Sequence, residues 1–253
     1  MNRKIKQYLL FTFVLSWSSW GLLILASVLN LNYLTYGNPT GMVLFILGGC
    51  SPAICGIIIH KRNSEKEEFH LFMKSITGVR HSLWSYLYAI GGALLILFVP
   101  VLFGYGSMKK PIYLGFVMIL PMIIGGGLEE IGWRGLLLPE LEKKLSHSLS
   151  TLLVSIVWAC WHVPLWFIEG SNQQSMNYGW FCIYAIALSF FIGSVRYVSQ
   201  SIFMAILAHG AINGFWEVIE PSKDYAVSIV LIIIVGVLTL AIDNRGKKAV
   251  RRP

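Results

Sequence analysis

Eight long stretches without a formal charge dominate this chain of 253 residues. Each is about 17 to 25 residues long, which is what an α-helix needs to cross a hydrocarbon core of roughly 30 Å. Strands of a membrane barrel would instead alternate polar and apolar residues over about ten positions. We therefore predict an all-α polytopic membrane protein, a bundle of about eight transmembrane helices. The stretches are 8–29, 40–59, 83–107, 112–128, 149–168, 178–195, 198–216 and 225–242.

The composition supports one membrane domain and no soluble one. Only 13% of the residues are charged, whereas soluble domains carry about 25%. We expect a single transmembrane domain over residues 1–253, with the motifs described below in a core of about 112–219. The first stretch follows three basic residues but is too long for a signal peptide, so we interpret it as a retained helix. The longest charged connector, 60–82, is expected to be a cytoplasmic loop with an interfacial helix.

The distribution of basic residues predicts how the chain crosses the membrane. With the N-terminus inside, sixteen of the 20 Lys and Arg residues fall in inner segments and three in outer loops, with Arg134 remaining. This asymmetry fits the positive-inside rule. It predicts a multi-pass membrane protein with both termini cytoplasmic. The formal net charge of +8 is spread over five short inner segments, so we expect no nucleic-acid partner.

A few polar groups interrupt the apolar pattern. An ionisable residue within a membrane helix indicates a functional site, because its desolvation costs several kcal/mol unless something compensates. The candidates are Glu129, Glu130, Arg134, His162 and His209, and the strongly polar Asn213 joins them.

Helical spacing separates the roles of the two glutamates. Residues four apart share a helix face, so Glu130 can pair with Arg134, while Glu129 shares the neighbouring face with Trp133. We predict that Glu130 is mainly structural and that Glu129 is the reactive carboxylate. The preceding run 125–127 is all glycine, which favours either close helix packing or a break in the helix near the site.

Two further clusters repeat the four-residue spacing. Trp158 and His162 share one helix face, and Pro164 predicts an interruption just past the histidine. His209 and Asn213 share a face of a later helix. If the helix that carries Glu129 continues to Leu138, Glu129 and both histidines lie at depths that agree within about two helical turns. We therefore expect one shared cavity, lateral or cytoplasmic, lined by Glu129, His162, His209 and Asn213.

Together the three motifs resemble the CAAX prenyl protease and bacteriocin-processing family of intramembrane proteases. The family pattern is E-E-x-x-x-R, then an aromatic residue with histidine four positions on, then H-x-x-x-N or D. Here these are Glu129-Glu130 with Arg134, Trp158 with His162, and His209 with Asn213. The tryptophan at the second motif and the sequence "WHVP" resemble the bacterial branch. The likeness extends over the fourth to seventh stretches.

The resemblance implies peptide-bond hydrolysis inside or at the edge of the membrane. Glu129 would be the general base that deprotonates a water, and His162 would help to hold that water or the scissile carbonyl. His209 and Asn213 would donate hydrogen bonds to the oxyanion. Glu130, Arg134, Trp133 and Trp158 would support the site. The expected partners are membrane lipid and a peptide or protein substrate.

A zinc-dependent version of this hydrolysis is the nearest alternative. One carboxylate and two histidines are a common set of zinc ligands in hydrolytic enzymes, and here these ligands would be Glu129, His162 and His209. The sequence lacks H-E-x-x-H, and we favour the metal-free glutamate mechanism with no cofactor. A transporter, or a non-enzymatic immunity protein that has kept the fold, ranks lower. The sequence identifies neither the substrate nor the physiological role, with processing, bacteriocin self-immunity and regulation all open.

Overall fold

The structure is a computed structural model that describes residues 3–221. Helices make up nearly all of it, and the predicted all-α polytopic class is confirmed. The α-helices are α1 (Arg3–Val28), α2 (Pro39–Asn63), α3 (Lys66–Thr77), α4 (Leu83–Tyr86), α5 (Gly92–Leu102), α6 (Ile112–Ile124), α7 (Glu130–Gly132), α8 (Leu138–Glu142), α9 (His147–Trp161), α10 (Tyr178–Ser199) and α11 (Ile202–Trp216). Shorter elements are η1 (Asn32–Leu34), η2 (Leu87–Gly91), η3 (Gly127–Glu129), η4 (Trp133–Leu137), η5 (Val163–Phe167), η6 (Asn172–Ser175), β1 (Gly106–Met108) and β2 (Ile219–Pro221).

Within the described residues, five helices are long and apolar enough to cross a membrane: Arg3–Val28, Asn32–Asn63, Leu83–Leu102, His147–Phe167 and Tyr178–Ser199. A sixth span exists if Ile112–Ile124 and Gly127–Glu142 are taken as one element bent by 45°. α11 is a shorter apolar helix. The predicted stretch 225–242 lies outside the described residues, so the total of about eight stays a prediction.

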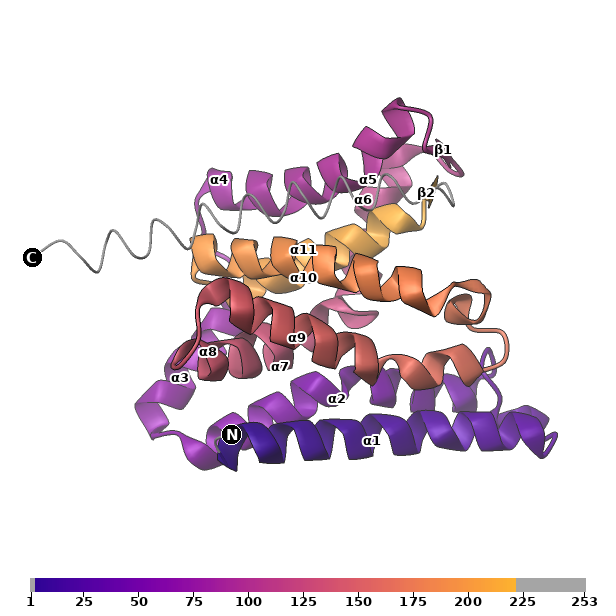
Figure 1. The fold of residues 1–253 in the computed structure, drawn as a ribbon, viewed down its shortest axis with the longest axis horizontal. Helices are drawn as coiled ribbons and strands as arrows, with labels where there is room; N and C mark the ends of the chain where they lie inside the picture. The colour runs from indigo at the N-terminus through magenta and orange to yellow at the C-terminus, as the bar shows by residue number, and fades with distance from the viewer. Residues whose placement is uncertain (1–2, 222–253) are drawn as a thin grey trace, which may run out of the picture.

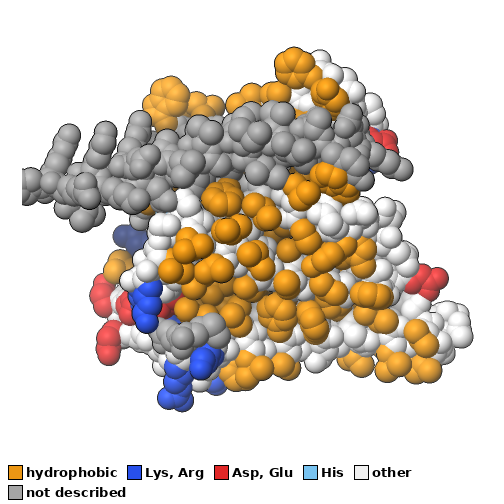
Figure 2. All heavy atoms as spheres, in the orientation of Figure 1, with side chains coloured by type: hydrophobic (Ala, Val, Ile, Leu, Met, Phe, Trp, Pro, Cys, Tyr) orange, Lys and Arg blue, Asp and Glu red, His pale blue; other side chains and the backbone are white. Residues whose placement is uncertain are grey.

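The long helices lie roughly side by side, with α1 and α2 forming one edge of the bundle (Figure 1). Hydrophobic side chains cover the middle of the face shown in Figure 2, and Lys, Arg, Asp and Glu gather at its ends. This arrangement suits a bilayer, because apolar side chains meet the lipid tails and charges reach water at either side. The amphipathic α3 occupies the predicted position of an interfacial helix in the connector 60–82.

α11 lies inside the bundle. It packs against α5, α6, α7, α10 and the turn η3, and nearly all of its side chains are buried. Its low charge content allows this, since no side chain except His209 and Asn213 needs a strong polar partner. His209 is therefore held in the interior, whereas Asn213 is only half-buried.

The glycine run breaks the helix ahead of Glu129. α6 ends at Ile124, and Gly126 has a φ of +157°, which residues with a side chain rarely adopt. The helix then resumes at 45° to α6 and continues past Glu129 through Glu142. The run is thus a break in the helix as well as a packing position. The third stretch is also shorter than the sequence suggested: helix ends at Leu102, and residues 106–108 pair as a strand with 219–221.

Candidate active site

Glu129 lies in the short 3-10 turn η3, directly after the helix break. Its side chain is buried, and its Oε2 accepts a hydrogen bond of 2.7 Å from the indole N–H of Trp158. This partner comes from α9, 29 residues further along the chain. The glutamate thus points into the bundle and not along its own helix face toward Trp133. One donor leaves the carboxylate with free lone pairs, so it can still accept a proton.

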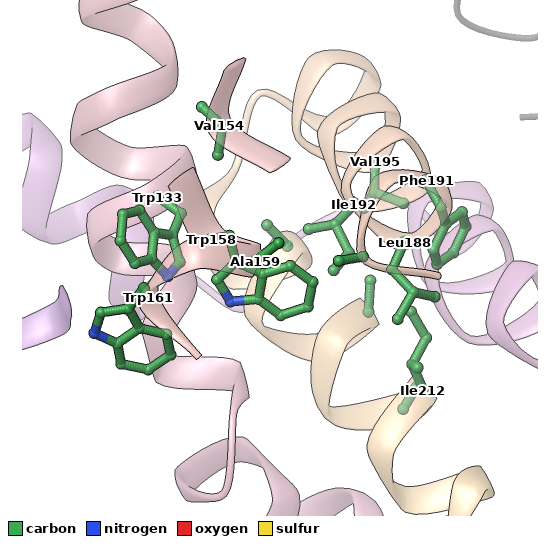
Figure 3. Close-up of a cluster of buried hydrophobic side chains, with 14 of the residues drawn as sticks. Trp133, Val154, Trp158, Ala159, Trp161, Leu188, Phe191, Ile192, Val195 and Ile212 are labelled. Atoms are coloured by element: carbon green, nitrogen blue, oxygen red, sulfur yellow. The ribbon is translucent and has the colours of Figure 1, made fainter. Parts of the chain in front are cut away.

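The indole of Trp158 is the centre around which the three motifs meet. Its ring lies edge to face with the ring of His162 at 4.8 Å and with that of His209 at 5.6 Å between centroids. The guanidinium carbon of Arg134 lies 5.9 Å from the same ring, a cation–π distance. Figure 3 shows Trp158 between Trp133 and Trp161 on one side and apolar residues of α10 on the other. The tryptophan therefore joins α9 to α11 and to the segment that carries both glutamates.

His162 lies where α9 ends. The helix ends at Trp161 and continues as the 3-10 turn η5, which confirms the interruption predicted from Pro164. The Nδ1–H of His162 donates to the carbonyl of Trp158 at 2.8 Å, since a carbonyl can only accept. In the neutral ring, Nε2 is then an acceptor. That nitrogen is suited to hold a water proton or to receive one.

Glu130 is the centre of a buried polar network. Its Oε2 lies 2.9 Å from Nη1 of Arg134, which confirms the predicted ion pair on one helix face. Arg134 also donates to Ser189 on α10 at 2.8 Å. The Nδ1–H of His209 donates to Glu130 Oε1 at 2.7 Å, a contact between residues 79 apart that the helical spacing did not predict. Glu130 therefore orients His209 as well as pairing Arg134, and it leaves Nε2 of His209 for a ligand.

Asn213 and His209 face the break in the helix. Nδ2 of Asn213 donates to the carbonyl of Gly125 at 3.3 Å. A Cβ atom on Gly126 would lie 2.4 Å from Nδ2 of Asn213 and 3.1 Å from Nε2 of His209. The backbone of the break thus touches both groups. Ser189 and Gly126 are neighbours of the candidate site residues that the sequence analysis did not name individually, although it had singled out the glycine run that contains Gly126.

The remaining predicted support residue has a packing role. Trp133 is fully buried and lies edge to face with Tyr8 and Trp161 at 5.6 and 5.8 Å. It holds the segment that carries Glu129 and Glu130 against α1 and α9. The expected cavity lined by Glu129, His162, His209 and Asn213 stays a prediction.

The zinc alternative can be compared with this geometry. In the part of the chain that the structure describes, no three His, Cys, Asp or Glu side chains lie close enough together to hold a metal ion. Nδ1 of each histidine is bonded, to the Trp158 carbonyl and to Glu130, which leaves Nε2 of each ring available. As they lie, Glu129, His162 and His209 do not form such a group. The absence of a cofactor stays a prediction, and we derive no step through a metal.

Fold and site define a class: a polytopic α-helical membrane protein whose interior gathers two carboxylates, two imidazoles, an amide and a guanidinium. Residues 111–215 match the family model "Type II CAAX prenyl endopeptidase Rce1-like", and all three motifs fall in this segment. The chain is also similar to "CAAX prenyl protease 2" of Methanococcus maripaludis, with 27% identity over 242 residues, covering 87% of this chain and 86% of that protein. The predicted resemblance to the CAAX prenyl protease family is therefore confirmed, and it supports an intramembrane endopeptidase.

Proposed function

We propose that this protein hydrolyses a peptide bond in or at the edge of the membrane, with Glu129 as the general base that activates water. The observation that carries the proposal is the convergence on Trp158. That residue holds Glu129 by a hydrogen bond and contacts the rings of both histidines, which come from separate helices. A base, a water-holding imidazole and oxyanion donors are the groups that such a hydrolysis requires.

In the proposed reaction, the water oxygen attacks the scissile carbonyl carbon while Glu129 takes the water proton. His162 accepts a hydrogen bond from that water through Nε2. As the C–O bond forms, the carbonyl oxygen becomes an oxyanion. When the C–N bond breaks, Glu129 returns its proton to the leaving amine, so the base is regenerated.

The oxyanion is stabilised by His209 and Asn213 in this proposal. The amide of Asn213 has a second N–H besides the one directed to Gly125. His209 uses Nδ1–H for Glu130, so it donates from Nε2 only when the ring is an imidazolium. The Glu130 carboxylate accepts the Nδ1–H bond and so fixes the orientation of the ring. Glu130 is therefore a positioning residue for His209.

The substrate is proposed from the relative's name: a protein or peptide with a prenylated C-terminal motif is the first to test. The site lies among membrane helices, so we propose that the substrate reaches it in extended form from the bilayer or the cytoplasmic side. We propose no nucleic-acid partner. We propose a location in the bacterial plasma membrane from the resemblance to the bacterial branch, and cytoplasmic termini from the distribution of basic residues.

The test compares membranes that contain the wild-type protein with membranes that contain Glu129→Gln. We expect an uncleaved precursor to accumulate in the variant, and cleavage of a prenylated reporter peptide to fall by about 10²- to 10⁴-fold. Glu67→Gln, an exposed residue of α3, is the matched control and should cleave normally. An unchanged proteome together with unimpaired reporter cleavage by Glu129→Gln would refute the proposal.

Metal dependence needs its own measurement. We propose that the hydrolysis proceeds without a metal, so activity should survive chelation and purified active protein should carry zinc well below one equivalent. Stoichiometric zinc, with activity lost to a chelator and restored by zinc, would replace the glutamate mechanism with the metal-dependent one.

A further inference from the structure

A polar cavity of about 230 Å³ opens beside the proposed site, between α8, α9 and α10. Its lining includes Arg134, Glu142, His147, Arg196 and Gln200. His147 is the first residue of α9, and Arg196 lies in the last turn of α10. The cavity is therefore at one end of these two membrane helices, at the depth where lipid headgroups meet water. In the predicted topology this is the cytoplasmic side.

Two guanidinium groups line this cavity, those of Arg134 and Arg196. Arg134 is already paired with Glu130. Glu142 is bonded to Nδ1 of His147 at 2.5 Å and also interacts electrostatically with Arg196. The Nε of Arg196 has no hydrogen-bond partner within residues 3–221. Nε2 of His147, whose side chain is buried, likewise has none there. Buried polar atoms without a partner are uncommon and call for a ligand or water.

We infer that this cavity binds a phosphate group, supplied by the headgroup of an anionic phospholipid. Arg196 is the principal contact, because a guanidinium matches phosphate oxygens with paired hydrogen bonds. Basic pockets between membrane helices on the cytoplasmic side are a recurring form of anionic headgroup site. Gln200 is exposed at the end of α10, and its Nε2 already donates one hydrogen bond to the carbonyl of Tyr197, so its second N–H can donate to the same group.

The cavity is connected to the proposed active site through one residue. Arg134 lines the cavity, and it also holds Glu130, which orients His209. A bound phosphate would restrain the guanidinium from the opposite side. Lipid binding is nevertheless measured separately from proteolysis, so this inference can fail while the proposed function holds, and the reverse.

The test measures lipid binding to the delipidated full-length protein in detergent by native mass spectrometry. Phosphatidylglycerol is compared with zwitterionic phosphatidylcholine, and inorganic phosphate is added alone and as a competitor. We expect saturable binding of phosphatidylglycerol that Arg196→Gln weakens about fivefold, the effect of one basic residue. Arg80→Gln removes the same charge from an exposed connector and should bind as the wild type does.

The outcomes separate the sources of the phosphate. Displacement of the lipid by millimolar inorganic phosphate, with direct phosphate binding, would assign the cavity to a soluble anion and overturn the lipid assignment. Equal binding by wild type, Arg196→Gln and Arg80→Gln would overturn the site itself. If Arg196→Gln does not fold, Gln200→Glu brings a negative charge to the cavity mouth and should weaken phosphatidylglycerol binding comparably.

Discussion

Glu130 and Arg134 bring opposite charges into an interior where neither is tolerated alone. Both side chains are at most 1% exposed, and the carboxylate also receives the N–H of His209. Removing one member of a buried pair leaves an uncompensated charge, which is more damaging than replacing both. The neighbouring Glu129 has one neutral donor, the indole of Trp158. Replacing Glu130 should therefore lower the stability of the fold more than replacing Glu129.

Glu130→Gln should destabilise the fold, whereas Glu129→Gln should leave it nearly intact. We expect Glu130→Gln to lose about 3 to 5 kcal/mol, the usual cost of breaking a buried ion pair. Chemical unfolding of the purified proteins in detergent measures the difference. Comparable stability of the two variants would show that Glu130 is not the structural carboxylate, and a large loss for Glu129→Gln would reverse the two roles.

Gly126 is a second residue at the proposed site, where its backbone faces the proposed oxyanion donors. In Gly126→Ala, the new methyl would meet Asn213 Nδ2 at 2.4 Å and strain a backbone with φ of +157°. Displacing the oxyanion donors by about 1 Å is expected to lower cleavage about a hundredfold. Gly49→Ala is the matched control, because a Cβ there meets nothing within 4 Å. Normal reporter cleavage by Gly126→Ala would argue against the oxyanion assignment.

At the scale of elements, a close approach of two helices sets where the glutamates lie. A Cβ on Gly56 of α2 would lie 3.0 Å from the Cα of Gly132 in α7. A Cβ on Gly132 would lie 2.2 Å from Oη of Tyr8 and 2.3 Å from the carbonyl oxygen of Pro52. Small residues at such contacts let backbones pack closely in membranes, where packing drives helix association. The short α7 is thus held against α1 and α2 directly behind Glu129 and Glu130.

Gly132→Ala should therefore separate α7 from α2. Because two of the clashing atoms are backbone or rigidly held, we expect at least the cost of overpacking, about 1 to 3 kcal/mol. Gly21→Ala lies in α1 with nothing within 4 Å of the new methyl, so its stability should be unchanged or slightly higher. Thermal unfolding of the two variants in detergent makes the comparison. Equal melting temperatures would mean that the contact between α2 and α7 accommodates the methyl group with no loss of stability.

At the scale of the whole molecule, the orientation in the membrane is the main expectation still to be measured. The four native cysteines are first replaced, and a single cysteine is then substituted for Lys109 or for Lys144. Both positions are exposed, and the proposed topology places them on opposite sides of the membrane. With cytoplasmic termini, a membrane-impermeant maleimide applied to intact cells should label position 109 and not 144. Both should react after lysis. The reverse pattern would invert the proposed topology.

Much of the fold could be read from local patterns. The first, second, fifth and sixth apolar stretches correspond to α1, α2, α9 with η5, and α10, since length and hydrophobicity alone specify a membrane helix. The positions of breaks were less predictable. α5 ends at Leu102, inside the uncharged stretch 83–107. Gly104 and Gly106, both at positive φ, were a signal for this end that an interpretation from charge and length alone did not use.

The sequence by itself determined the all-α membrane class, which polar groups interrupt the apolar stretches, and the pairing of Glu130 with Arg134. That pairing needs only the pitch of one helix, so residue spacing suffices. Only the tertiary structure decided that Glu130 also holds His209, that Trp158 holds Glu129, and that Gly126 touches Asn213. These contacts join separate helices. Spacing tells which residues share a face, but packing and the bend after α6 select which faces meet.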